Sequence, residues 1–184
     1  MMAKIRVNKI EAAQRQIDVT IELLFLNKDP IAIHTLASAA FRILRDISNK
    51  KKDSKMKQCL KAIFRPNMEK EFWAEMNKPA NFFKHADKDH DAILDNVDEK
   101  INDSMLFMAC LYYNDLGYQI TVEMHVLVSW YTAIYPDFFK DNKYLANILT
   151  DQLNSLRYKS RIEEIDIGYQ LLQQARILAK GGVL

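Results

Sequence analysis

The chain has few of the residues that interrupt regular structure, with four glycines and four prolines in 184 residues. An all-β chain needs many tight turns, and glycine and proline form a large share of them. Their scarcity disfavours such a fold and predicts helices joined by a small number of turns. No Gly/Pro/Ser-rich linker divides the sequence, so residues 1–184 are predicted to form a single domain.

Cysteines and long apolar runs are also scarce. Cys59 and Cys110 lie in different segments without Cys-x-x-Cys spacing, which is typical of reduced, packed thiols. No segment approaches the roughly 20 apolar residues of a membrane span, and the first residues hold no apolar run of signal-peptide length. We therefore predict a cytoplasmic protein with no membrane partner, and no pattern in the sequence calls for a cofactor.

Apolar residues recur at helical spacing along most of the chain. We expect an all-α bundle of about six to eight helices. The pattern predicts helices over residues 8–26, 30–47, 54–64, 67–76, 98–116 and 143–180, the last as one helix or two. Asp29 and Pro30 suit the start of the second helix, Pro79 should end the fourth, and Gly117 should stop the fifth.

The segment from Ile120 to Trp130 alternates apolar and other residues, as a strand would. It is long for a strand and has no evident partner strand. We predict a buried helix that Pro136 ends.

Charge is unevenly distributed, although the net charge is only +2. Residues 42–65 carry nine basic side chains and two acidic ones, whereas residues 87–103 carry seven acidic and two basic ones. A basic patch can hold phosphate backbones, although lysines between helices also form ordinary solvated turns. The predicted RNA contacts are Lys50, Lys51, Lys52, Lys55 and Lys84.

Five acids in the second segment match the ligand spacing of an EF-hand loop: Asp87, Asp89, Asp91, Asp95 and Asp98. However, Ala92 stands where that loop has glycine, and Asp98 is shorter than the bidentate glutamate. We predict a solvated acidic turn and no metal site.

Three segments prompt a resemblance: residues 9–13 (KIEAA), 29–40 (DPIAIHTLASAA) and 81–87 (NFFKHAD). Together they resemble a family of small bacterial all-helical proteins that has no established activity. More remotely, Asn81 and His85 resemble the second half of the motif of the HEPN superfamily, many of whose members cleave RNA as dimers. Ala80 stands where that motif has arginine, and Lys78 is the nearest cation.

The HEPN resemblance implies an RNA partner, a homodimer, and catalytic roles for His85, Asn81 and Lys78. Without the arginine fork the chain would be a degenerate member, non-catalytic or weakly catalytic. The alternative is a purely structural role, in which Asn81 and His85 hydrogen-bond the backbone at a helix end. His34 and His125 lie beside apolar faces and are predicted to be core histidines, with a contact between His34 and His85 left open.

Two other functions fit the same residues. One is a metal- or small-molecule-binding enzyme that uses His34, His85 and nearby acids. The other is a dimeric interaction protein in which the basic and acidic segments pair between protomers. The sequence does not decide whether the protein is an enzyme.

Overall fold

The computed structural model describes residues 4–51, 53–56, 68–85, 87, 90–136 and 156–181. These residues contain six α-helices, a short 3-10 turn and no strand, which confirms the all-α prediction. The elements are α1 (Lys9–Phe25), α2 (Pro30–Ser48), α4 (Met68–Phe82), α5 (Lys100–Asp115), α6 (Val122–Ile134), η2 (Leu156–Tyr158) and α9 (Arg161–Lys180).

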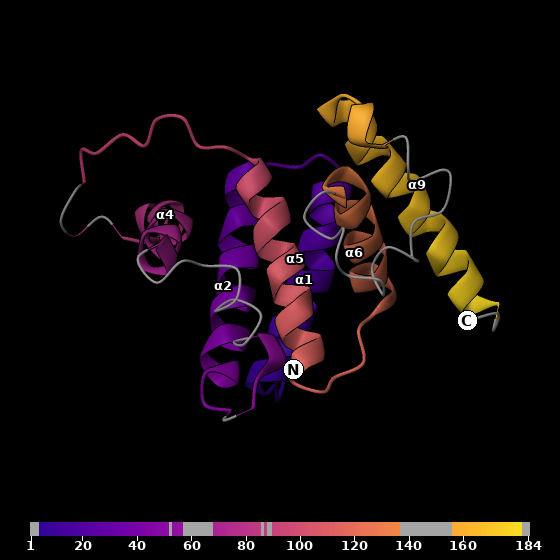
Figure 1. Cartoon of the computed structure of the whole chain (residues 1–184), viewed down its shortest axis with the longest axis horizontal. Coiled ribbons are helices and arrows are strands. Elements are labelled where there is room, and N and C mark those ends of the chain that lie inside the picture. The colour runs from indigo at the N-terminus through magenta and orange to yellow at the C-terminus, as the bar shows by residue number, and fades with distance from the viewer. Residues whose placement is uncertain are drawn as a thin grey trace.

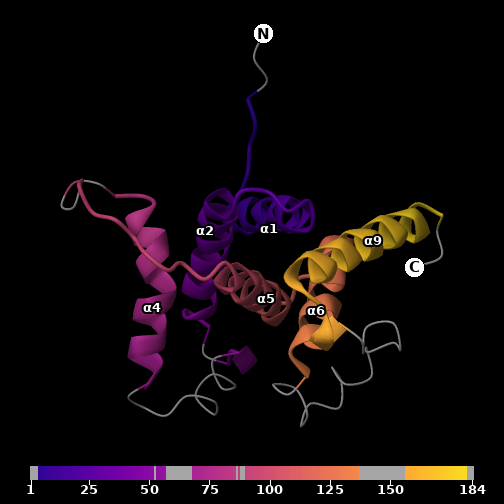
Figure 2. The ribbon, with the colours of Figure 1, turned by 90° about the horizontal axis from the view of Figure 1, so that it is seen from above.

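The helices form a bundle with α1, α2 and α5 at its centre (Figure 1). α2 packs on both α1 and α5, and α6 joins this group to α9. α4 packs on α2 and crosses it on the side of the bundle opposite to α9 (Figure 2). The two flanks of the bundle are therefore α4 and α9, and they differ in chemistry.

The boundary between α1 and α2 lies where the sequence predicts it. Asp29 Oδ1 accepts hydrogen bonds from two backbone N–H groups of the first turn of α2 at 3.0 and 2.9 Å, and Pro30 occupies the first helical position. Ala37 and Ala40 are fully buried, so neighbouring helices approach α2 closely.

The end of α5 also agrees with the prediction. Gly117 has φ +91°, a left-handed conformation that glycine adopts without a steric penalty. The N–H groups of Gly117 and Tyr118 donate to Asn114 O at 2.8 Å and Tyr113 O at 3.4 Å, and the rings of Tyr113 and Tyr118 lie 5.3 Å apart. This is a Schellman motif with its accompanying side-chain contact.

The ambiguous segment is a helix, as predicted. Thr121 caps α6 by accepting a hydrogen bond from Met124 N at 3.2 Å. Nine of the 13 residues of α6 are buried, because the helix lies between the central group and α9. A helix covered on several sides is apolar nearly all round, so its sequence lacks a one-sided helical stripe.

α9 docks on α6 and α1 beside two aromatic side chains, Trp130 and Phe25. Trp130 is fully buried, its Nε1–H donates to Glu164 O at 2.6 Å, and its ring meets that of Phe25 edge to face at 5.3 Å. Gly168 of α9 faces the same ring so closely that a Cβ there would overlap Phe25. The absence of a side chain at Gly168 is what allows this approach.

The prediction that Pro79 ends its helix is wrong, because α4 continues to Phe82. Proline removes one N–H from the helix, and in an interior position costs about 3 kcal/mol. Here Pro79 and Ala80 are buried, and Phe83 N donates to Pro79 O at 2.9 Å. Packing of this turn against the bundle offsets the lost hydrogen bond.

Three predicted helices lie partly outside the described residues, the helix predicted over residues 67–76 by its first residue only. Of residues 54–64, only 54–56 are described, and of residues 143–180 the description begins at 156. α9 starts after Ser160, whose side chain and that of Glu163 form a reciprocal cap. Cys59 is not described, while Cys110 is buried in α5 as predicted for a packed thiol.

Candidate functional site

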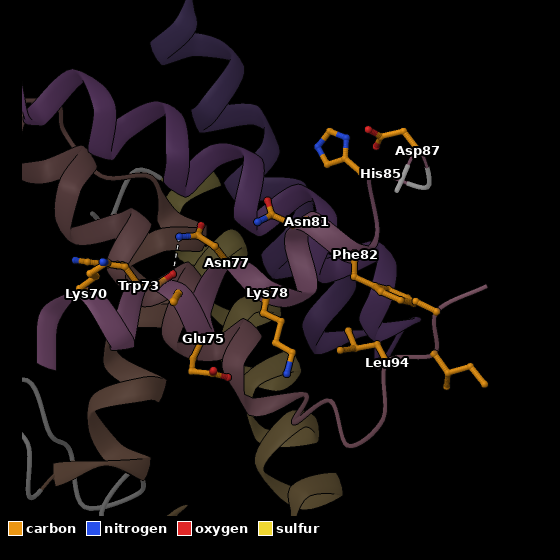
Figure 3. Close-up of a pocket in the computed structure, with 13 residues that line it drawn as sticks. Lys70, Trp73, Glu75, Asn77, Lys78, Asn81, Phe82, His85, Asp87 and Leu94 are labelled. Carbon is orange, nitrogen blue, oxygen red and sulfur yellow. Dashed lines mark hydrogen bonds between the residues drawn. The ribbon is translucent and has the colours of Figure 1, made fainter. Parts of the chain in front are cut away.

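An open hollow of about 1210 Å³ lies along the outer face of α4 (Figure 3). Trp73, Asn77 and Phe82 line it together with the three residues predicted as catalytic. Those three, Lys78, Asn81 and His85, therefore face one space. The extended segment 92–94 closes its other side.

The three predicted residues line the hollow without contacting one another through their side chains. All three are exposed, and no hydrogen bond joins their side chains. In Figure 3 the side chain of Lys78 extends toward the segment that carries Leu94, whereas His85 lies beyond the end of α4. None of the described residues forms a side-chain hydrogen bond with His85, so their catalytic role stays a prediction.

The structure adds Arg42, a residue of α2 that the sequence did not single out. Its Nη2 donates to Asn77 Oδ1 at 3.3 Å and to Asn81 Oδ1 at 3.4 Å. The side chain of Asn81 therefore links two helices and does not cap the end of α4. A guanidinium thus stands beside Asn81, although the sequence motif has Ala80 where arginine is expected.

Like Arg42, Lys84 lies at the crossing of α2 and α4 and outside the hollow. Its Nζ donates to Ser38 Oγ at 3.4 Å, and it is not among the residues that line the hollow. Burial, and then the charge of Arg42, lower the pKa of Lys84. Two like charges are therefore held close together at the crossing of α2 and α4.

His34 is a core histidine, as predicted. It is 1 % exposed, and its Nδ1 lies 2.8 Å from Asn102 Oδ1 on α5. Burial is the main reason why the pKa of His34 is lowered, with a further contribution from Lys84. His85 is exposed, so the two imidazoles do not meet in the core.

The same prediction for His125 is wrong, because His125 is exposed on α6. Its neighbours along the sequence are apolar, and only the packing of α6 shows which side faces solvent. An apolar context in the sequence is therefore not evidence of burial at one position.

The basic turn after α2 is anchored to the end of α5. Lys51 Nζ donates to Leu116 O at 3.0 Å and to Asp115 O at 3.4 Å, where the helix dipole favours a cation. Asp115 Oδ1 in turn accepts from Lys55 N at 2.9 Å. Lys50 and Lys55 are exposed, Lys52 is outside the described residues, and none of the described lysines of this turn lines the hollow.

The acids with EF-hand spacing are exposed where they are described. Asp87, Asp91, Asp95 and Asp98 all face solvent, while Asp89 lies outside the described residues. Nowhere in the described part of the chain do three or more His, Cys, Asp or Glu side chains gather as they would around a metal ion. The exposure of the four described acids agrees with the predicted solvated turn.

A second charged cluster, absent from the predictions, joins α5 to α9. Arg161 donates to both oxygens of Asp103 at 2.7 and 2.9 Å and also lies 3.4 Å from Glu99 and 3.5 Å from Glu164. Asp103 is fully buried, and burial raises its pKa to about 6 despite the nearby Arg161. Arg161 and Asp103 are 58 residues apart in the sequence, so no local sequence pattern reveals this pair.

Comparison of the chain with protein-family models, curated proteins and solved structures finds no match. The HEPN resemblance and the homodimer stay predictions. Among the described helices, none combines the length and the apolar character that crossing a bilayer requires.

Proposed function

We propose that this protein binds single-stranded RNA along α4, with Lys78 contacting its phosphates in the hollow and Arg42 and Lys84 contacting them at the crossing of α2 and α4. The observation that carries the proposal is that none of these three cations forms an ion pair with a described carboxylate. Cations that no carboxylate neutralises attract a polyanion and supply most of its binding free energy.

The hollow supports an extended ligand. At about 1210 Å³ it is larger and more open than the roughly 300–1,000 Å³ pockets that enclose small molecules. Trp73 and Phe82 offer aromatic surface, and Asn77 and Asn81 carry amides. Unpaired bases stack on aromatic rings and hydrogen-bond to amides, so this lining suits a single strand.

The proposal is for binding without efficient cleavage. The HEPN resemblance agrees with an RNA partner, and Arg42 supplies a guanidinium from a neighbouring helix. However, His85 has no side-chain hydrogen bond to a described residue that would orient it as a base. The arrangement therefore favours holding a strand over reacting with it.

The test is the salt dependence of binding to a labelled oligouridylate, followed by fluorescence anisotropy. Each phosphate contact to a single strand contributes about 0.7 to the slope of log K against log salt concentration. Arg42→Ala and Lys78→Ala should each weaken binding and reduce the slope by about that amount. Lys9→Ala, which removes an exposed lysine of α1, is the matched control.

Binding that is absent or insensitive to salt contradicts the proposal, and so does an equal loss in the Lys9→Ala control. Lys50→Ala and Lys55→Ala, measured in the same way, show whether the basic turn adds phosphate contacts of its own.

A further inference from the structure

The crossing of α2 and α4 brings together Arg42, Lys84 and His34, and no described carboxylate pairs with any of them. Arg42 and Lys84 lie close enough for the charge of one to lower the pKa of the other, and Lys84 has the same effect on His34. Lys84 reaches the hydroxyl of Ser38, and Arg42 reaches only amide oxygens. An anion is the ligand that such a set lacks.

One atom of this set has no hydrogen-bond partner among the described residues. The amide nitrogen of Asn102 donates to Pro30 O at 3.1 Å, so Asn102 Oδ1 is the end that faces His34 and must accept from it. The proton of His34 is therefore on Nδ1, and Nε2 holds a lone pair. His34 Nε2 is buried and makes no hydrogen bond to any residue that the structure describes. Most buried polar atoms in proteins have a hydrogen-bond partner, so this one is an unusual feature of a core.

Neighbours on two elements hold the imidazole of His34. Its Nδ1 is bound to Asn102 of α5, and the ring of Phe83 covers it in an edge-to-face contact with the ring centroids 5.5 Å apart. Phe83 and Lys84 form the turn directly after α4. Local opening needs less free energy at a helix end than in the core, so this turn can uncover His34.

We propose that the crossing of α2 and α4 is a phosphate-binding subsite, in which Arg42 and Lys84 hold the phosphate and His34, uncovered by Phe83, donates to it. For this His34 takes up one proton from solvent at Nε2, so that both ring nitrogens become donors. This inference rests on the proposed function, because the phosphate that binds here is a backbone phosphate of the bound RNA strand. A free tetrahedral dianion offers the same chemistry.

The charged surroundings of His34 make this proton uptake depend on the ligand. Lys84 faces His34 from the turn after α4, and Arg42 lies two turns along α2. On α5, the neutral amide of Asn102 faces His34, and the carboxylate of Asp103 is paired with Arg161. Without a ligand the nearby charges are positive and oppose protonation; a bound phosphate reverses their effect.

The experiment is calorimetric titration of oligouridylate into the full chain at pH 6.5, in two buffers with different ionisation enthalpies. Uridine and phosphodiester groups do not titrate near this pH, so the difference between buffers counts protons taken up by the protein. We expect an uptake approaching one proton, and an affinity that rises by up to about tenfold per unit as pH falls. A second titration replaces the oligouridylate with inorganic sulfate, which is a dianion at every pH used.

His34→Gln should abolish the proton uptake, and Phe83→Ala, which removes the cover, should tighten binding several-fold. If His34→Gln does not fold, the imidazole resonances of the native chain replace it: sulfate should raise the titration midpoint of His34 and leave that of exposed His125 unchanged.

The two proposals fail separately. RNA binding without proton uptake overturns the subsite and leaves the proposed function intact. Sulfate-linked uptake at His34 without RNA binding supports the subsite and removes the strand as its source. Uptake that persists in His34→Gln, or no uptake with either ligand, overturns the subsite.

Discussion

The two flanks of the bundle differ in how their charged side chains are paired. Where α9 meets α5, one arginine faces three carboxylates, and Asp103 receives two short hydrogen bonds from it. Where α4 meets α2, Arg42 and Lys84 face amides and a hydroxyl at 3.3 to 3.4 Å. In the first set the buried carboxylate of Asp103 is paired with Arg161, as a structural contact requires, whereas in the second neither cation has an ion pair with a described carboxylate.

The largest expected effect is on the α5/α9 flank. Arg161→Ala leaves the carboxylate of Asp103 buried and uncompensated, which should lower the free energy of unfolding by about 3–5 kcal/mol. Urea denaturation at pH 7 measures this. Arg42→Ala is the matched change on the other flank and should alter the free energy of unfolding by about 0.5 kcal/mol or less. Similar losses in both variants would erase the contrast between the flanks.

The second largest effect is expected where α9 closely approaches the core. Gly168→Ala places a methyl group where the ring of Phe25 lies, so the ring must move, with a loss of about 1–3 kcal/mol of stability. Thermal or urea unfolding measures it. Gly181→Ala, at the exposed end of the same helix with φ −80°, is the control and should have little effect. If Gly168→Ala is as mild as the control, α9 does not pack on Phe25 in solution.

A smaller effect should appear with pH. Because burial raises the pKa of Asp103 to about 6, the folded state binds its proton more tightly than the unfolded state does. The stabilisation from protonated Asp103 is complete below the unfolded pKa and is lost as pH rises through about 6. Between pH 5 and pH 7 this group should reduce the free energy of unfolding by about 1 kcal/mol. Asp103→Asn should remove that component from urea denaturation curves, and an unchanged pH profile would contradict it.

The smallest effect concerns the basic turn. Lys51→Ala removes the cation at the carbonyl end of α5 and should lower stability by about 0.3–1 kcal/mol, less at high salt. Lys50→Ala removes an equal charge from an exposed neighbour and should change nothing measurable. Equal effects in chemical denaturation would mean that Lys51 does not cap α5.

The candidate site was predictable only in part. The pairing of Asn81 with His85, and the nearby Lys78, is visible in the sequence, and all three line the hollow. Arg42 was not predicted to join them, because it reaches Asn81 across 39 positions of the chain. Lys84 was predicted as an RNA contact, but its orientation toward Ser38 follows from how α4 crosses α2.

Local signals in the sequence were enough for the helices themselves. The cap at Asp29 and Pro30 and the stop at Gly117 act within a few residues, and apolar spacing identifies the buried faces of α1 and α2. Where a local signal failed, at Pro79 and at His125, packing against other helices overrode it.

The sequence by itself determined that the chain is helical and where most described helices begin and end, because capping and periodicity are short-range. Only the tertiary structure decided which charges are neutralised. Because of how distant helices pack, Arg161 meets its carboxylates and Arg42 meets no described one. That pairing depends on separations that no local pattern encodes.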